Sequence, residues 1–241
     1  MMPCFTTSWD DGHPLDIRLA ELLASHGCKG TFYVPSPSSG MEVMTPAEIR
    51  QIHNLGMEIG AHTVSHSVLT QLDSLRVRQE LLGGKEWLED IVGSPVAAFC
   101  FPKGKFNPRV CRIVEECGYR LARTTVAFRT DFNFQPSAMP VSFQFLPHPR
   151  TIHVRHALRE GNAVGLFRWA SRWSFESDLE RLSAGMMQYV SRSEGIVHIW
   201  GHSWELERYG LWPSLNRCLK LLTEFSSLRR MTNSGVLDLM E

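Results

Sequence analysis

The first half of the chain alternates short apolar runs with amphipathic stretches, and this alternation limits the folds open to it. Strands are predicted where β-branched and aromatic residues gather, and helices where apolar residues recur every three or four positions. Thr45 and Glu48 form a capping box with Pro46 at the first helical position. Strands are predicted over 4–9, 31–35, 57–61, 96–101, 119–124 and 195–200, and helices over 15–25, 46–55, 74–91, 108–117, 155–163, 175–191 and 213–225.

Alternating strands and helices indicate βαβ units and therefore a parallel α/β sheet. The strands are apolar on both faces, as a sheet covered by helices requires. A length of 241 residues fits one large domain spanning 1–241. The stretch 125–150 holds four prolines and little periodicity, and we interpret it as an irregular insertion beside the site.

Acidic and basic residues balance at 25 each, so the sequence offers no basic excess that would suggest nucleic acid or an anionic membrane as partner. No apolar run is long enough to span a bilayer, and the N-terminus lacks the features of a signal peptide. None of the six cysteines forms a CxxC pair. We therefore expect reduced cysteines and a cytoplasmic protein, with the oligomeric state left open.

Two adjacent carboxylates, Asp10 and Asp11, end the first predicted strand, and His62 and His66 follow the third. Alone, Asp-Asp-Gly is typical of a turn and histidines four apart are typical of a solvated helix face. Together, one carboxylate and two imidazoles form a ligand set that suits a divalent metal and leaves positions open for water. Since adjacent strand residues point to opposite sides, one aspartate should bind metal while the other acts as a base beside the water.

Two further loops carry polar groups at strand ends. Phe101-Pro102-Lys103-Gly104 follows one strand and His202 follows the strand at 195–200. The carboxyl ends of parallel strands share one edge of the sheet, where active sites gather. The remaining histidines have no such context, and we expect them to be surface or locally hydrogen-bonded residues: His13, His26, His53, His148, His153 and His156.

These residues resemble the motifs of the polysaccharide deacetylases, which form carbohydrate esterase family 4 and share the NodB-homology domain. Ser8-Trp9-Asp10-Asp11-Gly12 resembles the first motif, TFDDG, and the segment from His62 to His66 resembles the second, H[S/T]xxH. FPKG falls where RPPYG would be, and His202 falls where the LxH motif would be; the fourth motif is not clearly present. The resemblance spans roughly residues 4–207 and implies a distorted (β/α) barrel, usually of seven units.

The resemblance also implies roles. Asp11, His62 and His66 would be the metal ligands, Asp10 the catalytic base and His202 the acid that protonates the leaving amine. The backbone N–H near Lys103, after Pro102, would help stabilise the oxyanion. The metal would be zinc by default, although cobalt, nickel or iron would fit the same ligands. The reaction would be hydrolysis of an N-acyl or O-acyl group, typically acetyl, on an amino sugar.

The sequence departs from the family at the third motif, where alignment on Pro102 and Gly104 puts Cys100 in place of an arginine that orients the base. We hypothesise that Arg123, at the end of the next strand, takes over that role. His198 is an alternative acid, but His202 is preferred because it lies past the strand end. Trp200 and Trp204 flank His202, and their indoles could stack on a sugar ring, while Glu205 and Asp131 are further candidates for substrate contacts.

Three functional readings follow. The first is a cytoplasmic, metal-dependent deacetylase acting on an N-acetylated sugar, such as a soluble or lipid-linked glycan precursor. The second keeps the fold and hydrolyses another amide, such as a cyclic imide, ureide or formamide, which the altered third motif makes credible. The third is a module that binds metal and glycan without catalysis. The intact set of Asp10, Asp11, His62 and His66 weighs against the third reading, because binding alone does not require a base.

Overall fold

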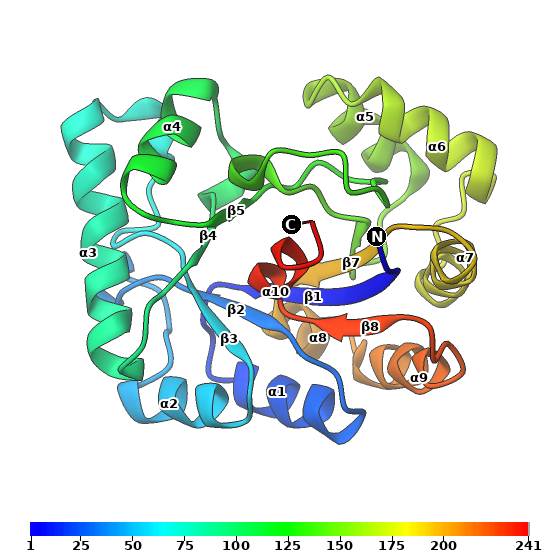
Figure 1. Cartoon of the computed structure of the whole chain (residues 1–241), viewed down its shortest axis with the longest axis horizontal. Helices are drawn as coiled ribbons and strands as arrows, with labels where there is room; N and C mark the ends of the chain where they lie inside the picture. Colours follow the sequence, from blue (N-terminus) through cyan, green and yellow to red (C-terminus); the bar gives the residue numbers. More distant parts are fainter. Residues whose placement is uncertain (241) are drawn as a thin grey trace.

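The computed structural model describes residues 1–240, and its centre is a sheet in which every strand pairing is parallel. Figure 1 shows most of the helices around the outside of these strands, with the C-terminal helix α10 (Asn233–Leu237) in the middle of the view. The strands are β1 (Cys4–Asp10), β2 (Thr31–Val34), β3 (Glu58–Ala61), β4 (Ala98–Cys100), β5 (Leu121–Arg123), β6 (Phe143–Gln144), β7 (Ile196–Gly201) and β8 (Arg229–Met231).

The strand order along the sheet is β5-β4-β3-β2-β1-β7-β6, with β8 paired to β1 off this path. On one side, β1 pairs with β7 from Cys4 to Trp9. On the other side, β8 pairs with the first half of β1 and β2 pairs with the second half, from Ser8. Seven strands therefore form a curled path, and the predicted α/β fold with a distorted parallel barrel is confirmed.

The chain between β5 and β6 links the two ends of this path. The Met139 N–H donates to the Ala122 carbonyl at 2.8 Å, and the Thr124 N–H donates back to Met139 at 2.8 Å. Three residues further on, the Ser142 N–H donates to His198 of β7 at 2.8 Å. The segment 125–150, expected to be irregular, thus contributes a short turn (Pro136–Ala138) and β6, and its backbone hydrogen bonds draw β5 toward β7.

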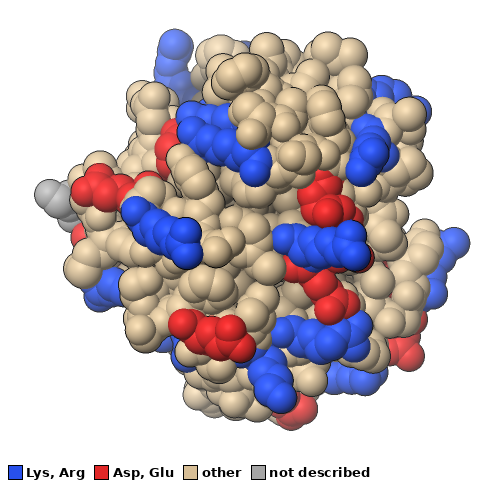
Figure 2. Space-filling model, turned by 90° about the vertical axis from the view of Figure 1, so that its right-hand side faces the viewer, with Lys and Arg blue, Asp and Glu red and all other residues tan. Residues whose placement is uncertain are grey.

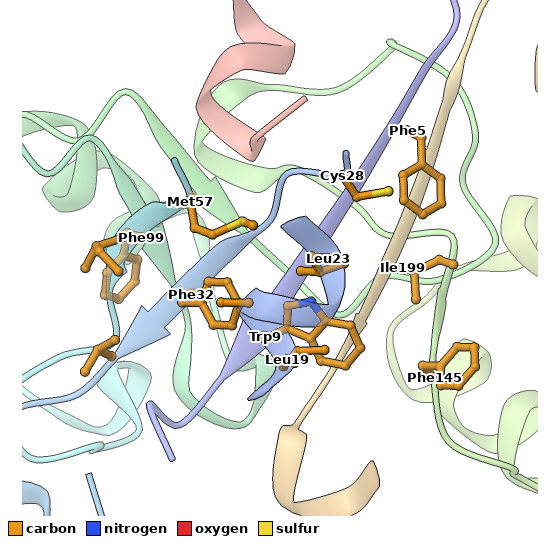
Figure 3. Close-up of a cluster of buried hydrophobic side chains, with 14 of the residues drawn as sticks. Phe5, Trp9, Leu19, Leu23, Cys28, Phe32, Met57, Phe99, Phe145 and Ile199 are labelled. Atoms are coloured by element: carbon orange, nitrogen blue, oxygen red, sulfur yellow. The ribbon is translucent and has the colours of Figure 1, made fainter. Parts of the chain in front are cut away.

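The helices bury their apolar faces against the sheet. In Figure 3, Trp9 of β1 lies among Leu19 and Leu23 of the first helix and Phe32 of β2, and all four are fully buried. The helices are α1 (Asp16–Ser25), α2 (Pro46–Asn54), α3 (Ser74–Val92), α4 (Pro108–Glu116), α5 (Arg150–Arg159), α6 (Ala163–Trp173), α7 (Leu179–Ser191), α8 (Ser203–Arg208), α9 (Trp212–Leu222) and α10 (Asn233–Leu237).

The connection from β6 to β7 differs from the sequence prediction, which placed helices at 155–163 and 175–191 and none between. The structure has a helical hairpin of α5 and α6 before α7. Gly161, with φ of +63°, ends the first helix, and the Asn162 side chain caps the second by accepting from the Gly165 N–H at 2.9 Å. Asp178 caps α7 in the same way. The prediction was wrong here because Gly161 and Asn162 end one helix and begin the next, whereas the predicted helix ran on to 163 and no helix was expected over 164–173.

All six cysteines are free thiols, five of them buried. Within residues 1–240, no helix combines the length and the apolar character needed to cross a bilayer. The face drawn in Figure 2 carries Lys and Arg interspersed with Asp and Glu rather than one large patch of a single sign.

Candidate active site and metal centre

A cavity of about 310 Å³ opens at the carboxyl ends of the strands. Seven of the residues singled out in the sequence as candidates for the site line it: Asp10, Asp11, His62, His66, Lys103, Trp200 and His202. Pro102, Arg123 and His198 are buried and are not among the residues that line the cavity. Strand ends far apart in the chain therefore meet at one edge, as the parallel arrangement requires.

Asp11, His62 and His66 converge on one point. Asp11 Oδ1 lies 3.8 Å from His62 Nε2 and 3.5 Å from His66 Nε2. One possible ligand atom from each of the three lies within 4.8 Å of the others. A carboxylate with two imidazoles at this spacing fits the donor set of zinc and similar divalent metals. Possible ligand atoms of Asp10, His62 and Cys100 also lie within 4.8 Å of one another, so His62 belongs to both groups.

Both aspartates reach the cavity, although adjacent residues of a regular strand would point to opposite faces. Asp10 is the last residue of β1, but Asp11 lies beyond the strand with φ of +78°. This left-handed backbone turns the Asp11 side chain to the same side as Asp10. The alternation argument therefore does not apply at this position, and the two carboxylates differ instead in their partners.

The imidazole of His62 is fixed from behind. Its Nδ1 donates a hydrogen bond to the Cys100 carbonyl at 2.8 Å, which leaves Nε2 as the nitrogen facing Asp11. Burial lowers the pKa of His62 to about 4 and also lowers the pKa of His66. Both rings are therefore neutral at pH 7, and neutral imidazole is the form that binds a metal.

The loop that carries both histidines is held by α3. One carboxylate oxygen of Glu80 accepts from the N–H groups of Val64 at 2.9 Å and Ser65 at 2.8 Å, and the other accepts from the Ser65 hydroxyl at 2.6 Å. Gly84 lets the helix approach closely, since a Cβ there would lie 3.2 Å from the Thr63 carbonyl carbon. His66 itself has φ of +55°. The two histidines therefore lie on a constrained loop and not on a helix.

Asp10 forms a buried ion pair with Arg123, and the Cys100 thiol donates to its other oxygen at 3.6 Å. Burial alone would raise the pKa of Asp10, but the Arg123 guanidinium, with His62 and His202, lowers it below its usual value. The guanidinium also lies 4.7 Å from the centre of the Trp200 ring. Arg123 thus contacts the aspartate that a third-motif arginine would orient, and Cys100 pairs with it in register on the neighbouring strand.

His202 begins a chain of hydrogen bonds that ends at Gln144 and His148, two other residues of the cavity wall. Its Nδ1 lies 2.7 Å from Glu205 Oε2, which also accepts from the Gln144 amide at 3.0 Å. His148 Nε2 donates to the carbonyl oxygen of the same Gln144 at 3.2 Å. Burial disfavours the charged ring of His202, but the hydrogen bond with Glu205 and the nearby aspartates outweigh it and raise its pKa to about 8.

His198 has a different environment. Its Nε2 lies 2.8 Å from the Ser8 hydroxyl and its Nδ1 donates to the Pro140 carbonyl at 3.1 Å. Burial lowers its pKa to about 3, so the ring is neutral at physiological pH. His198 has both nitrogens engaged within the fold, whereas His202 faces the cavity with Nε2 located 3.7 Å from Asp11 Oδ2.

The remaining candidates divide between the cavity and its surroundings. Lys103 lines the cavity in a left-handed backbone conformation, with φ of +56°. Trp204 donates its indole N–H to Asp11 Oδ2 at 3.2 Å. Asp131 is paired with Arg129 and Arg168 instead of facing the cavity.

Sequence reasoning missed part of the cavity wall. His148, His153 and His156, expected to be surface or local residues, line the cavity together with Gln144. The spacing of His153, His156, Ala157 and Glu160 places one face of α5 against the cavity. That spacing is a helical signal, but only the tertiary position of α5 shows which surface it faces.

A family model described as polysaccharide deacetylase matches residues 3–122. The chain belongs to this family. A chitin deacetylase from Pestalotiopsis sp is 25% identical over 179 residues, which cover 67% of this chain and 60% of that protein. The chain spans between 38% and 60% of the length of the curated relatives it matches.

Two solved structures share the fold at low identity. A family 4 acetyl xylan esterase from Clostridium thermocellum, bound to cobalt, superposes with a TM-score of 0.62 at 18% identity, covering 98% of this chain and 91% of that one. A CE4-family pseudoenzyme from Bacillus anthracis gives 0.58 at 15% identity, covering 100% of this chain and 66% of that one. An enzyme and a pseudoenzyme therefore share this fold, so activity must be argued from the site.

Proposed function

We propose that this polysaccharide deacetylase family member is a metal-dependent hydrolase that removes an acetyl group from an N-acetylated amino sugar. The observation that carries the proposal is the meeting of Asp11, His62 and His66 beside the buried pair of Asp10 and Arg123. The first set has the donors for a metal, and the second supplies an ionised carboxylate next to it. A site that only bound a glycan would not require that second carboxylate.

Asp11, His62 and His66 would hold the metal, and their donors fit zinc, cobalt, nickel or iron. A divalent ion there would acidify water and polarise the acyl carbonyl. The neutral state of both imidazoles and the Nδ1 hydrogen bond of His62 support this assignment. Burial lowers the pKa of both rings, so each is already neutral and can bind a cation without first losing a proton.

Asp10 would accept the proton of the water that attacks the acyl carbon. Its low pKa keeps it ionised, and the buried Arg123 holds it in place. His202 would donate a proton to the departing nitrogen, because its raised pKa keeps the ring protonated near neutral pH. The backbone at Lys103, which lines the cavity, would face the developing oxyanion.

Another amide substrate was considered because Cys100 stands where the third motif of the family has an arginine that orients the base. The contact between Arg123 and Asp10 supplies an arginine to the same carboxylate from the adjacent strand, which favours the acetylated sugar. The compensation is local: Cys100 and Arg123 occupy paired positions on β4 and β5.

Acetate release from a panel of N-acetylated sugars tests the proposal, with wild type compared with Asp10→Asn. Removing the base should lower kcat by at least about 100-fold while metal content stays at the wild-type level. A panel that also contains a cyclic imide, a ureide and a formamide covers the alternative bond types. Unchanged activity in Asp10→Asn would remove the proposed role of that residue.

A further inference from the structure

Three histidines without a part in the reaction proposed above lie together on the cavity wall. The ring centre of His148 lies 5.6 Å from that of His153 and 6.0 Å from that of His156. His153 and His156 are on α5, one turn apart, and both are half-buried. Asp11 and His62 line the same cavity, so the histidine cluster and the reaction centre share one cavity.

The cluster is held rigidly. The His153 ring packs edge-on against Phe128, with ring centres 5.4 Å apart, and against the fully buried Trp169 at 5.0 Å. Phe128 and Trp169 stack on each other at 4.8 Å. Gln144 accepts from His148, as described above. A wall fixed in this way is preorganised to bind a ligand without paying much ordering entropy.

The three imidazoles are neutral hydrogen-bonding groups. Burial lowers the pKa of His153 to about 4 and lowers the pKa of His148 and His156 in the same direction. A neutral imidazole such as His153 or His156 has one N–H donor and one acceptor nitrogen, which complements a hydroxyl group that both donates and accepts. His148 donates its N–H to Gln144 and so offers an acceptor nitrogen only. Arg159 and Glu160, at the exposed end of this wall, are opposite in charge, so together they add no net charge to the cavity.

The size and lining of the cavity suit a small sugar. Phe128, Phe143 and Trp200 are largely buried and form an apolar part of the cavity wall. The volume of about 310 Å³ is at the lower end of the range of about 300–1,000 Å³ for small-molecule sites. Loops after β1, β3, β4, β5 and β7 line the cavity together with β6 and α5, and its volume has room for a single sugar unit but not for several.

We propose that His148, His153 and His156 form a subsite for the hydroxyl groups of a small, uncharged N-acylated sugar, so that the substrate is a free saccharide unit and not an internal unit of a polymer. This inference rests on the proposed function, because it assigns the acyl group to the Asp10 and Asp11 end of the same cavity. The proposed subsite depends on α5, whose position beside the cavity the sequence does not predict.

Calorimetric titration of zinc-loaded Asp10→Asn protein tests the subsite by binding alone, with N-acetylglucosamine and N-acetylated chitotetraose as probes. N-acetylglucosamine should bind, and chitotetraose should bind no more tightly. In the same background, His156→Leu and His153→Phe should each weaken binding about tenfold. His156→Gln should restore part of the affinity because it keeps a neutral donor and acceptor. His26→Leu, a change at a histidine bonded to Asn216 away from the cavity, should leave the affinity unchanged.

The outcomes separate this inference from the proposed function. Failure of N-acetylglucosamine to bind, equal affinity in His156→Leu and His156→Gln, or chitotetraose binding tenfold tighter would each overturn the subsite. A second equivalent of zinc lost in His153→Phe would reassign the cluster to a metal and also overturn it. Binding that follows the expected pattern, while wild type releases no acetate, would support the subsite and overturn the proposed deacetylation. Thermal melts of each variant confirm that the fold is intact.

Discussion

At the scale of single residues, the pairing of Asp10 with Arg123 links the chemistry of the site to the stability of the fold. Arg123 is fully buried, and two of its nitrogens, Nε and Nη1, have no hydrogen-bond partner in the described structure. Its charge is therefore balanced chiefly by Asp10. Removing one member of such a pair leaves the other charged and desolvated, whereas removing both does not.

Arg123→Met should therefore lower the free energy of unfolding by about 3–5 kcal/mol, since it leaves the Asp10 carboxylate unpaired. The double variant Asp10→Asn/Arg123→Met should recover most of that loss, although neither protein should release acetate. Urea unfolding followed by circular dichroism measures both values. If Arg123→Met were as stable as wild type, the ion pair with Arg123 would not be what holds Asp10.

At the scale of elements, α3 determines how the loop after β3 presents its histidines. Glu80 accepts three hydrogen bonds from Val64 and Ser65, between the two histidines in sequence. The sequence places two adjacent glycines, Gly83 and Gly84, inside this helix but does not indicate their purpose. The structure shows that Gly84 makes room for the backbone of Thr63.

Glu80→Ala should weaken metal binding by about 10–100-fold, because the loop loses the contacts that orient its two imidazoles. Competition with a chelator of known affinity measures the change. Glu86→Ala, at an exposed position on the same helix, is the matched control and should bind metal as wild type does. Equal affinities for the two variants would mean that the loop holds its shape without Glu80.

A second contact between elements predicts a pH dependence. Asp131 pairs with Arg129 and with Arg168 of α6, and these arginines outweigh burial and lower its pKa to about 2. The unfolded value is about 3.9, so the folded state binds fewer protons and the stabilisation is present above pH 4. It is lost as the pH falls through 2. Because Asp131 is only half-buried, its contribution is about 1 kcal/mol after allowance for solvent screening.

Asp131→Asn should therefore be about 1 kcal/mol less stable than wild type at pH 6. The difference should shrink as the pH falls from 4 toward 2. Urea unfolding at several pH values measures it. A stability difference that stays constant down to pH 2 would show that the charge of Asp131 is not its cause.

At the scale of the whole molecule, the sequence predicted the parallel sheet, its first five strands and the placement of motifs at their carboxyl ends. Those features depend on local periodicity and on the geometry that all parallel sheets share. The α5–α6 hairpin, the short β6 and β8, and the histidines of α5 were missed. Their positions depend on contacts between segments distant in sequence, such as Phe128 and His153 around Trp169. The left-handed backbone of Asp11 was missed for a different reason, because non-glycine residues seldom adopt this conformation.

The proposed function requires that Asp11, His62 and His66 hold a divalent metal. The most direct measurement is the metal content, by mass spectrometry, of purified wild type and of the double variant His62→Ala/His66→Ala, with circular dichroism to confirm folding. We expect one equivalent of divalent metal in wild type and none in the folded double variant. Wild-type protein that binds no metal after incubation with zinc, or a double variant that retains it, would show that these residues do not form the metal site.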